Sequence, residues 1–183
     1  MMRSSAACTF ILLLVAATAS GAEHSGDGAL ARGQYLTNLL GCGRCHTEGY
    51  LTGNEAAGPY LAGSKIGIAY TAYSEDDDRP GVVFAGNLTS DAATGLGNWS
   101  EAEIIRAMTA GVTKGGHERL IVMPWPNYTA LTHDDLTAIA KFLKALPAVE
   151  REIPEPIPEG DDIYHPYVRF GVYEFHPRPT AGE

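Results

Sequence analysis

The chain has 183 residues, of which 45% are hydrophobic, and its formal net charge is −9 at pH 7. An acidic balance of this size excludes nucleic-acid binding through net charge, because like charges repel. The length fits one domain with short extensions.

The first 22 residues have the pattern of a secretory leader. Arg3 supplies a positive charge, residues 10–15 form an apolar run, and small residues follow as far as Ala22. The run is shorter than the about 20 residues that a membrane span needs. We therefore expect a cleaved signal peptide over residues 1–22, export to the periplasm and no membrane span in the mature chain. An uncleaved anchor is the alternative.

Residues 27–40 form the first predicted helix. Asp27 is a suitable N-cap, leucines recur on one face, and Gly41 ends the pattern. This helix ends directly before the motif at residues 42–46.

The motif is CxxCH, formed by Cys42, Cys45 and His46. Its spacing is the signature of covalent c-type haem attachment, in which two thiols bind the porphyrin and the imidazole binds the iron. Cys8 lies in the leader, so the mature chain keeps no other cysteine. The sequence therefore predicts one covalent haem c.

A long connection follows over residues 64–86, with an acidic run at 75–78. It is compatible with a small hairpin or lid and with a solvated loop, and we favour the solvated loop. The acidic run lacks the spaced ligands of a calcium loop.

Two more helices are predicted beyond this connection. A capping box opens the first, with Ser100 at the N-cap and Glu103 at N3, and Met108 on its apolar face is interpreted as core. The second begins after Thr132 and ends before Pro147, with apolar residues at i, i+3, i+4 and i+7.

Met123 is the candidate for the sixth iron ligand. It lies in the apolar stretch 120–126, where we expect prolines to hold the backbone extended and present the thioether opposite His46. His117 is the rival ligand, and simple packing of Met123 under the haem edge is the structural alternative.

Residues 150–183 form an extension of two parts. The first, 150–162, is rich in proline and acidic residues, and 164–175 contains five aromatic residues. These aromatics either fold back over the body or anchor a partner subunit. We favour folding back.

The order of these features carries a family resemblance. In chain order they are a helix, CxxCH, Gly58-Pro59, Asn87-Leu88-Thr89, Gly95 to Ser100, Met123-Pro124-Trp125 and a capped helix ending in Leu146-Pro147. Over residues 27–149 this resembles class I cytochrome c, particularly the cytochrome subunits and domains of bacterial periplasmic dehydrogenases. The resemblance implies a mainly α fold, with three or more helices and loops wrapped around one haem in residues 23–149. It leaves 150–183 as a non-helical extension.

The resemblance also implies roles for single residues. The carbonyl of Pro59 would accept the Nδ1 hydrogen bond of His46, and the indole of Trp99 would lie beside a haem propionate. Met123 would be the axial methionine. The first and last helices would cross next to each other.

These features predict a one-electron carrier that performs no bond chemistry itself. Its partners would be a donor dehydrogenase and a terminal oxidase or other acceptor, with the C-terminal extension as a possible contact in a hetero-oligomer. A haem-based sensor or enzyme with an open sixth position is the alternative. A haem-free dithiol oxidoreductase is a further one, although it would need a strand before the motif.

Overall fold

The protein is described by a computed structural model over residues 26–54, 57–70, 81–116 and 122–169. Its elements are α1 (Gly26–Leu39), α2 (Cys42–His46), the 3-10 helix η1 (Tyr50–Thr52), β1 (Gly67–Tyr70), β2 (Gly81–Val83), α3 (Glu101–Ala110), α4 (Trp125–Tyr128), α5 (His133–Ala145) and β3 (Tyr167–Val168). No helix within these ranges is long and apolar enough to cross a membrane. The expected signal peptide lies outside them. Because α1 begins at Gly26, Asp27 lies in the first turn and not at the N-cap.

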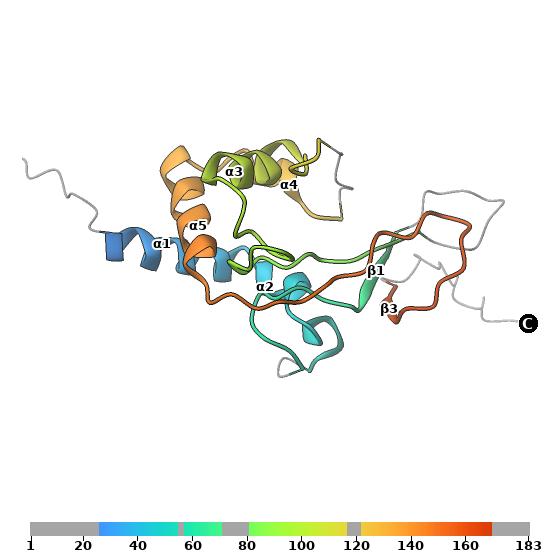
Figure 1. The fold of residues 1–183 in the computed structure, drawn as a ribbon. Helices are drawn as coiled ribbons and strands as arrows, with labels where there is room; N and C mark the ends of the chain where they lie inside the picture. The colour runs from blue at the N-terminus through green and yellow to red at the C-terminus, as the bar shows by residue number, and fades with distance from the viewer. Residues whose placement is uncertain (1–25, 55–56, 71–80, 117–121, 170–183) are drawn as a thin grey trace, which may run out of the picture.

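Helices α1 and α5 cross at one end of the molecule, as Figure 1 shows. A Cβ added to Gly33 would lie 2.1 Å from the carbonyl oxygen of Ala138 and 2.7 Å from Cβ of Phe142, so glycine permits this close approach. Arg32 Nε donates to Asp135 Oδ1 at 2.8 Å across the same crossing. The expected neighbouring first and last helices are confirmed.

The predicted ends of α3 and α5 are also confirmed. Ser100 Oγ accepts the N–H of Glu103, and the Glu103 carboxylate accepts the N–H of Ser100, which completes the capping box. Gly111 ends α3 in the left-handed region at φ 63°. Thr132 Oγ1 caps α5 by accepting the N–H of Asp135 at 3.1 Å.

One core joins the helices and the loops between them. Met108 belongs to it and is 6% exposed, which confirms its interpretation as a core residue. The buried members are Leu36, Leu61, Leu96, Ile104, Met108, Tyr128, Leu136, Ile139, Ala140 and Leu143. Members from α1, α3, α4 and α5 share this core, so the four helices pack as one body.

The connection 64–86 contains two paired strands, so the favoured solvated loop is wrong for its two ends. β1 and β2 pair antiparallel, with Ile68 opposite Val83, and β3 joins β1 in parallel to give the order β2-β1-β3. The buried side chains of β1 and β2 explain why the ends are ordered. The acidic run lies in 71–80, outside the described residues.

The extended backbone expected over 120–126 is also wrong in part. Pro124 is the N-cap of the short helix α4, and Pro126 is its second residue. Proline is tolerated in the first turn of a helix, where its missing N–H has no intrahelical partner to lose. The prolines therefore start a helical turn that leads to Tyr128 in the core.

Residues 149–168, which we call the C-terminal strap, run from α5 along the body to the sheet (Figure 1). The carbonyl of Val149 accepts Asn87 Nδ2 at 2.7 Å. Ile157 and Val82 exchange two backbone hydrogen bonds of 2.8 Å. The proline-rich part of the extension thus lies against the body, whereas the folding back expected of the aromatic residues is not seen for Tyr164.

The aromatic residues of the extension differ in exposure. Tyr164 is 87% exposed and Tyr167 is 40% exposed. Phe170, Tyr173 and Phe175 lie outside the described residues. The strap is therefore held by its backbone and polar side chains more than by Tyr164.

Candidate functional site

The CxxCH motif forms its own short helix. Gly41 adopts the left-handed region at φ 71° between α1 and α2, a conformation that glycine reaches without strain. Within α2, Cys42 and Cys45 are three residues apart and so lie on one face. His46 ends the helix. The turn thus presents two thiols together, followed at once by an imidazole.

Both cysteines carry free, half-buried thiols. Burial raises the pKa of Cys42 to about 11 and raises the pKa of Cys45 as well. Redox-active dithiols instead need a lowered pKa, because the thiolate is the nucleophile. Helix α1 also stands where the dithiol oxidoreductase would need a strand. The geometry therefore disfavours that alternative.

The imidazole of His46 is fixed through one ring nitrogen. Nδ1 lies 2.8 Å from the carbonyl oxygen of Gly86. A carbonyl oxygen only accepts hydrogen bonds, so this contact requires the proton on Nδ1. In the neutral ring, Nε2 then carries the lone pair that a metal ion would use.

The acceptor differs from the expected one. The carbonyl of Pro59 accepts the N–H of Ala62 at 3.2 Å, while the imidazole contacts Gly86. The hydrogen bond from Leu88 N–H to the Leu61 carbonyl, 2.9 Å long, brings the 86–88 segment to this place. Sequence reasoning missed Gly86 because this pairing joins segments far apart in the chain.

Three of the other predicted site residues share one neighbourhood. Cys42, Trp99 and Met123 are partly buried and pack against the same core. The sequence separates them by up to 81 positions, and the fold brings them together. The rival ligand His117 lies outside the described residues.

Tyr128 connects this neighbourhood to the thiols. Tyr128 is 8% exposed in the core against which Cys42 packs, and its pKa is raised to about 12, first by burial and then by charge on Cys42 and Cys45. Tyr128 ends α4, five residues after Met123. The last residue of α4 and the first residue of α2 therefore meet the same core. No sequence pattern pointed to Tyr128.

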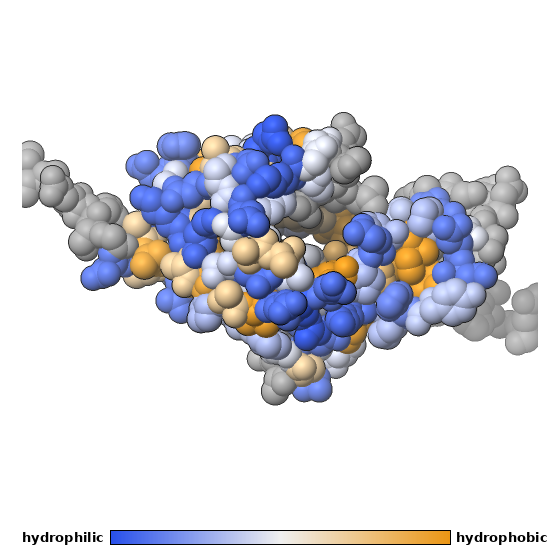
Figure 2. All heavy atoms as spheres, viewed as in Figure 1, coloured by the Kyte–Doolittle hydropathy of each residue, from blue (hydrophilic) through white to orange (hydrophobic). Residues whose placement is uncertain are grey.

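The surroundings fit a large, mostly apolar group. The indole of Trp125 packs on Gly111, and its Nε1 is buried with no acceptor among the described residues. A carboxylate on a bound group would satisfy that donor. Apolar side chains that the core covers only in part include Leu40, Leu88, Trp99, Ile105, Met123 and Trp125. Figure 2 shows the surface hollowed beside α3 and α4, with hydrophobic residues at the hollow.

The donor groups also match a haem. Two thiols, one imidazole held with its proton on Nδ1 and one thioether are the groups that attach and ligate haem c. Within the described ranges, no three His, Cys, Asp or Glu residues gather into a metal site of their own. The residues present therefore fit a haem better than a bare metal ion.

Comparison with known proteins agrees with this chemistry. The family model for cytochrome c matches residues 30–147. The cytochrome c subunit of the quinone alcohol dehydrogenase of Gluconobacter oxydans (strain 621H) is 29% identical over 131 residues, which are 72% of this chain and 24% of the relative.

Two further relatives carry similar names. The same subunit from Gluconacetobacter polyoxogenes is 30% identical over 78% of this chain and 28% of the relative. The gluconate 2-dehydrogenase cytochrome c subunit of Pantoea cypripedii is 27% identical over 80% and 32%. The chain thus spans about a quarter to a third of the length of these relatives.

Proposed function

The chain belongs to the cytochrome c family, and from this premise we propose that it is a one-electron carrier with a single haem c. The family implies a covalently bound haem c. Cys42 and Cys45 would hold that haem through thioether bonds, and His46 and Met123 would ligate its iron. The observation that carries the proposal is the α2 turn, which joins paired thiols to an imidazole protonated on Nδ1.

The haem would supply reversible one-electron oxidation and reduction of its iron. The protein would orient the proximal imidazole through the Gly86 carbonyl, which keeps the Nδ1 proton in place. The half-buried apolar residues around α4, together with Trp99, would exclude water from the iron. No group in this arrangement performs bond chemistry on a substrate.

The partner would be a dehydrogenase that donates electrons. Support comes from the names of the relatives, which are cytochrome c subunits of alcohol and gluconate dehydrogenases. The leader pattern of residues 1–22 supports export to the periplasm, where haem attachment takes place. The exposed Tyr164 on the strap remains a candidate contact with a partner subunit.

The function is tested on the full chain produced with export and haem-attachment machinery. A pyridine haemochrome assay should give one haem per chain. In the Met123→Ala variant the methionine-to-iron charge-transfer band should disappear, carbon monoxide should bind the reduced protein, and the reduction potential should fall, since an axial methionine raises it.

The matched control is Met108→Leu, which changes the other described methionine within the core. This volume-conserving change should leave the band and the potential unaltered. A ferric spectrum that is unchanged in Met123→Ala would refute methionine ligation. Carbon monoxide binding to the wild-type reduced protein would favour the sensor with an open sixth position.

A further inference from the structure

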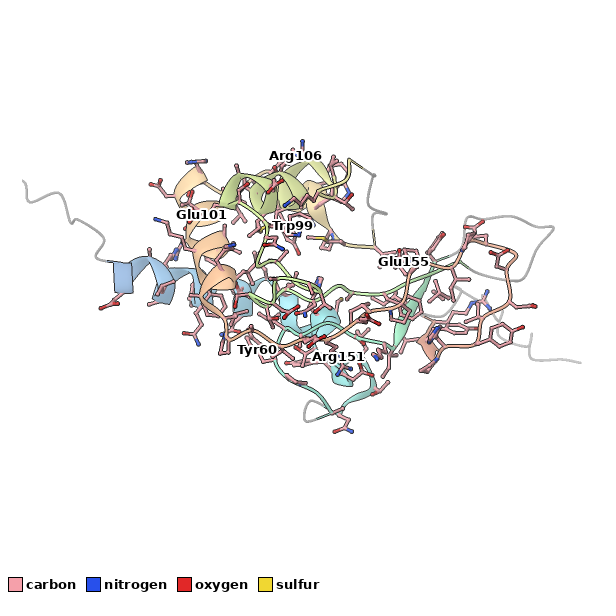
Figure 3. All side chains as sticks on the ribbon, viewed as in Figure 1. Tyr60, Trp99, Glu101, Arg106, Arg151 and Glu155 are labelled. Carbon is pink, nitrogen blue, oxygen red and sulfur yellow. The ribbon has the colours of Figure 1, made fainter. Side chains whose placement is uncertain are left out.

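The C-terminal strap contacts the segment that follows His46. Arg151 Nη2 donates to Glu48 Oε2 at 2.5 Å, and the two side chains are only 22% and 18% exposed. Glu48 lies two residues after His46, whereas Arg151 lies 103 residues further along the chain. Figure 3 shows Arg151 on the strap, next to the loop that follows α2. This ion pair therefore fixes the strap beside the haem-attachment turn.

A second strap contact reaches the backbone of His46. A Cβ on Gly63 would lie 2.7 Å from Ile153 Cδ1, so Ile153 packs directly on this glycine. The N–H of Gly63 donates to the carbonyl of His46 at 2.8 Å. The strap thus contacts the residue whose N–H bonds to the carbonyl of His46.

The strap also holds the segment that orients the imidazole. Gly86, the acceptor of the Nδ1 contact, lies between Val82 and Asn87, and both of these bond to the strap. Ile157 exchanges two hydrogen bonds with Val82, and the Val149 carbonyl accepts from Asn87. The strap therefore bonds to residues on both sides of Gly86, whose carbonyl accepts the hydrogen bond of the His46 imidazole.

We propose that the C-terminal strap, keyed by the Arg151–Glu48 ion pair, is a positioning element for His46. The strap lies beyond residue 147, where the family match ends. The proposal rests on the proposed function, because it assigns to these residues the orientation of a haem ligand. Neither Arg151 nor Glu48 would ligate the iron. They act through the backbone on either side of the imidazole.

A double-mutant cycle on the full-length haem protein tests the proposal. Its variants are Glu48→Gln, Arg151→Gln and the double variant. Glu48→Gln keeps an oxygen for the Lys65 N–H, which donates to Glu48 Oε2 at 2.8 Å, so this variant should fold. The readouts are haem content, the low-spin ferric electron paramagnetic resonance (EPR) spectrum and the reduction potential.

If the pair positions His46, both single variants should retain haem and show the same change in the ferric EPR spectrum. The double variant should show no larger change than either single variant, because one interaction is lost in all three. If the groups act only through their charges, the potentials should shift in opposite directions and add in the double variant, with an unchanged EPR spectrum. That result overturns the proposal.

Arg32→Gln is the matched control. It removes another ion pair between residues 103 apart, Arg32 with Asp135, which joins α1 to α5 away from His46. Its EPR spectrum and reduction potential should equal those of the wild type. If Arg32→Gln changes the EPR spectrum as much as Glu48→Gln and Arg151→Gln do, the proposal is overturned. If the Arg151→Gln protein does not accumulate, Arg151→Lys is used in its place. A wild-type ferric EPR spectrum in Glu48→Gln then contradicts the proposal. A wild-type protein without haem would contradict the proposed function instead.

Discussion

Single residues in this protein take their roles from close contacts that the fold creates. Gly86 has no side chain, yet its carbonyl fixes the proton on Nδ1 of His46. Gly33 matters because its missing Cβ leaves space for the backbone at Ala138. At both positions the backbone, and not a reactive side chain, determines the local geometry.

Replacing Gly33 with alanine tests the helix crossing. Alanine favours the helix by about 1 kcal/mol, but its Cβ would overlap the Ala138 carbonyl, and such overpacking costs about 1–3 kcal/mol. Because the obstacle is backbone, we expect the free energy of unfolding to fall by about 2 kcal/mol in urea titration. Gln34→Ala, at an exposed position of α1, is the control and should change little. A Gly33→Ala protein as stable as the wild type would show that the helices separate without cost.

Some helices and strands are defined by residues close to them in the sequence, and others are stabilised by contacts with distant segments. α3 and α5 have side-chain caps within four residues of their first turns, so their boundaries are local properties. The β1 and β2 strands are stabilised by each other and by the strap through β3. The short α4 depends on burial of Tyr128. Elements of the second kind therefore depend on the intact body.

Removing the cap of α3 tests its local character. Ser100→Ala loses the acceptor for the Glu103 N–H and should lower the free energy of unfolding by about 1 kcal/mol. Far-UV circular dichroism during urea titration measures the loss. Arg106→Ala, at an exposed position in the middle of the same helix (Figure 3), should stay close to the wild type. Equal effects of the two substitutions would argue against the capping box.

For the molecule as a whole, three acidic side chains make the free energy of unfolding depend on pH. The pKa of Asp91 is lowered by the Thr94 N–H, that of Glu103 by the Ser100 N–H, and that of Asp135 by Arg32. Each is a carboxylate whose charged form is favoured in the folded state. Their contribution is complete above the unfolded pKa values of 3.8 to 4.5 and is lost as the pH falls through the lower folded values.

We therefore expect acid to destabilise the protein. Urea titrations at about pH 6 and about pH 3 should give a lower free energy of unfolding at the acidic value. Asp135→Asn removes one of the three groups, and its stability should fall less between the two conditions. A variant with the same loss as the wild type would exclude Asp135 as a source of the pH dependence. The groups are partly exposed, so added salt should weaken the effect.

The sequence by itself determined the haem-attachment motif, the three longer helices and two of their caps. These are local properties, because spacing and capping depend on residues a few positions apart. It also placed Met108 in the core through helical periodicity. The identity of the family followed from the same local motifs and was confirmed by the match over residues 30–147.

Only the tertiary structure decided the contacts between distant segments. The Gly86 acceptor, the shared core of Tyr128 and Cys42 and the paired strands at the ends of 64–86 all join parts of the chain that no local pattern links. The Arg151–Glu48 pair spans 103 residues. Such contacts form because folding buries apolar segments against one another, and their partners are chosen by the packing of the whole body.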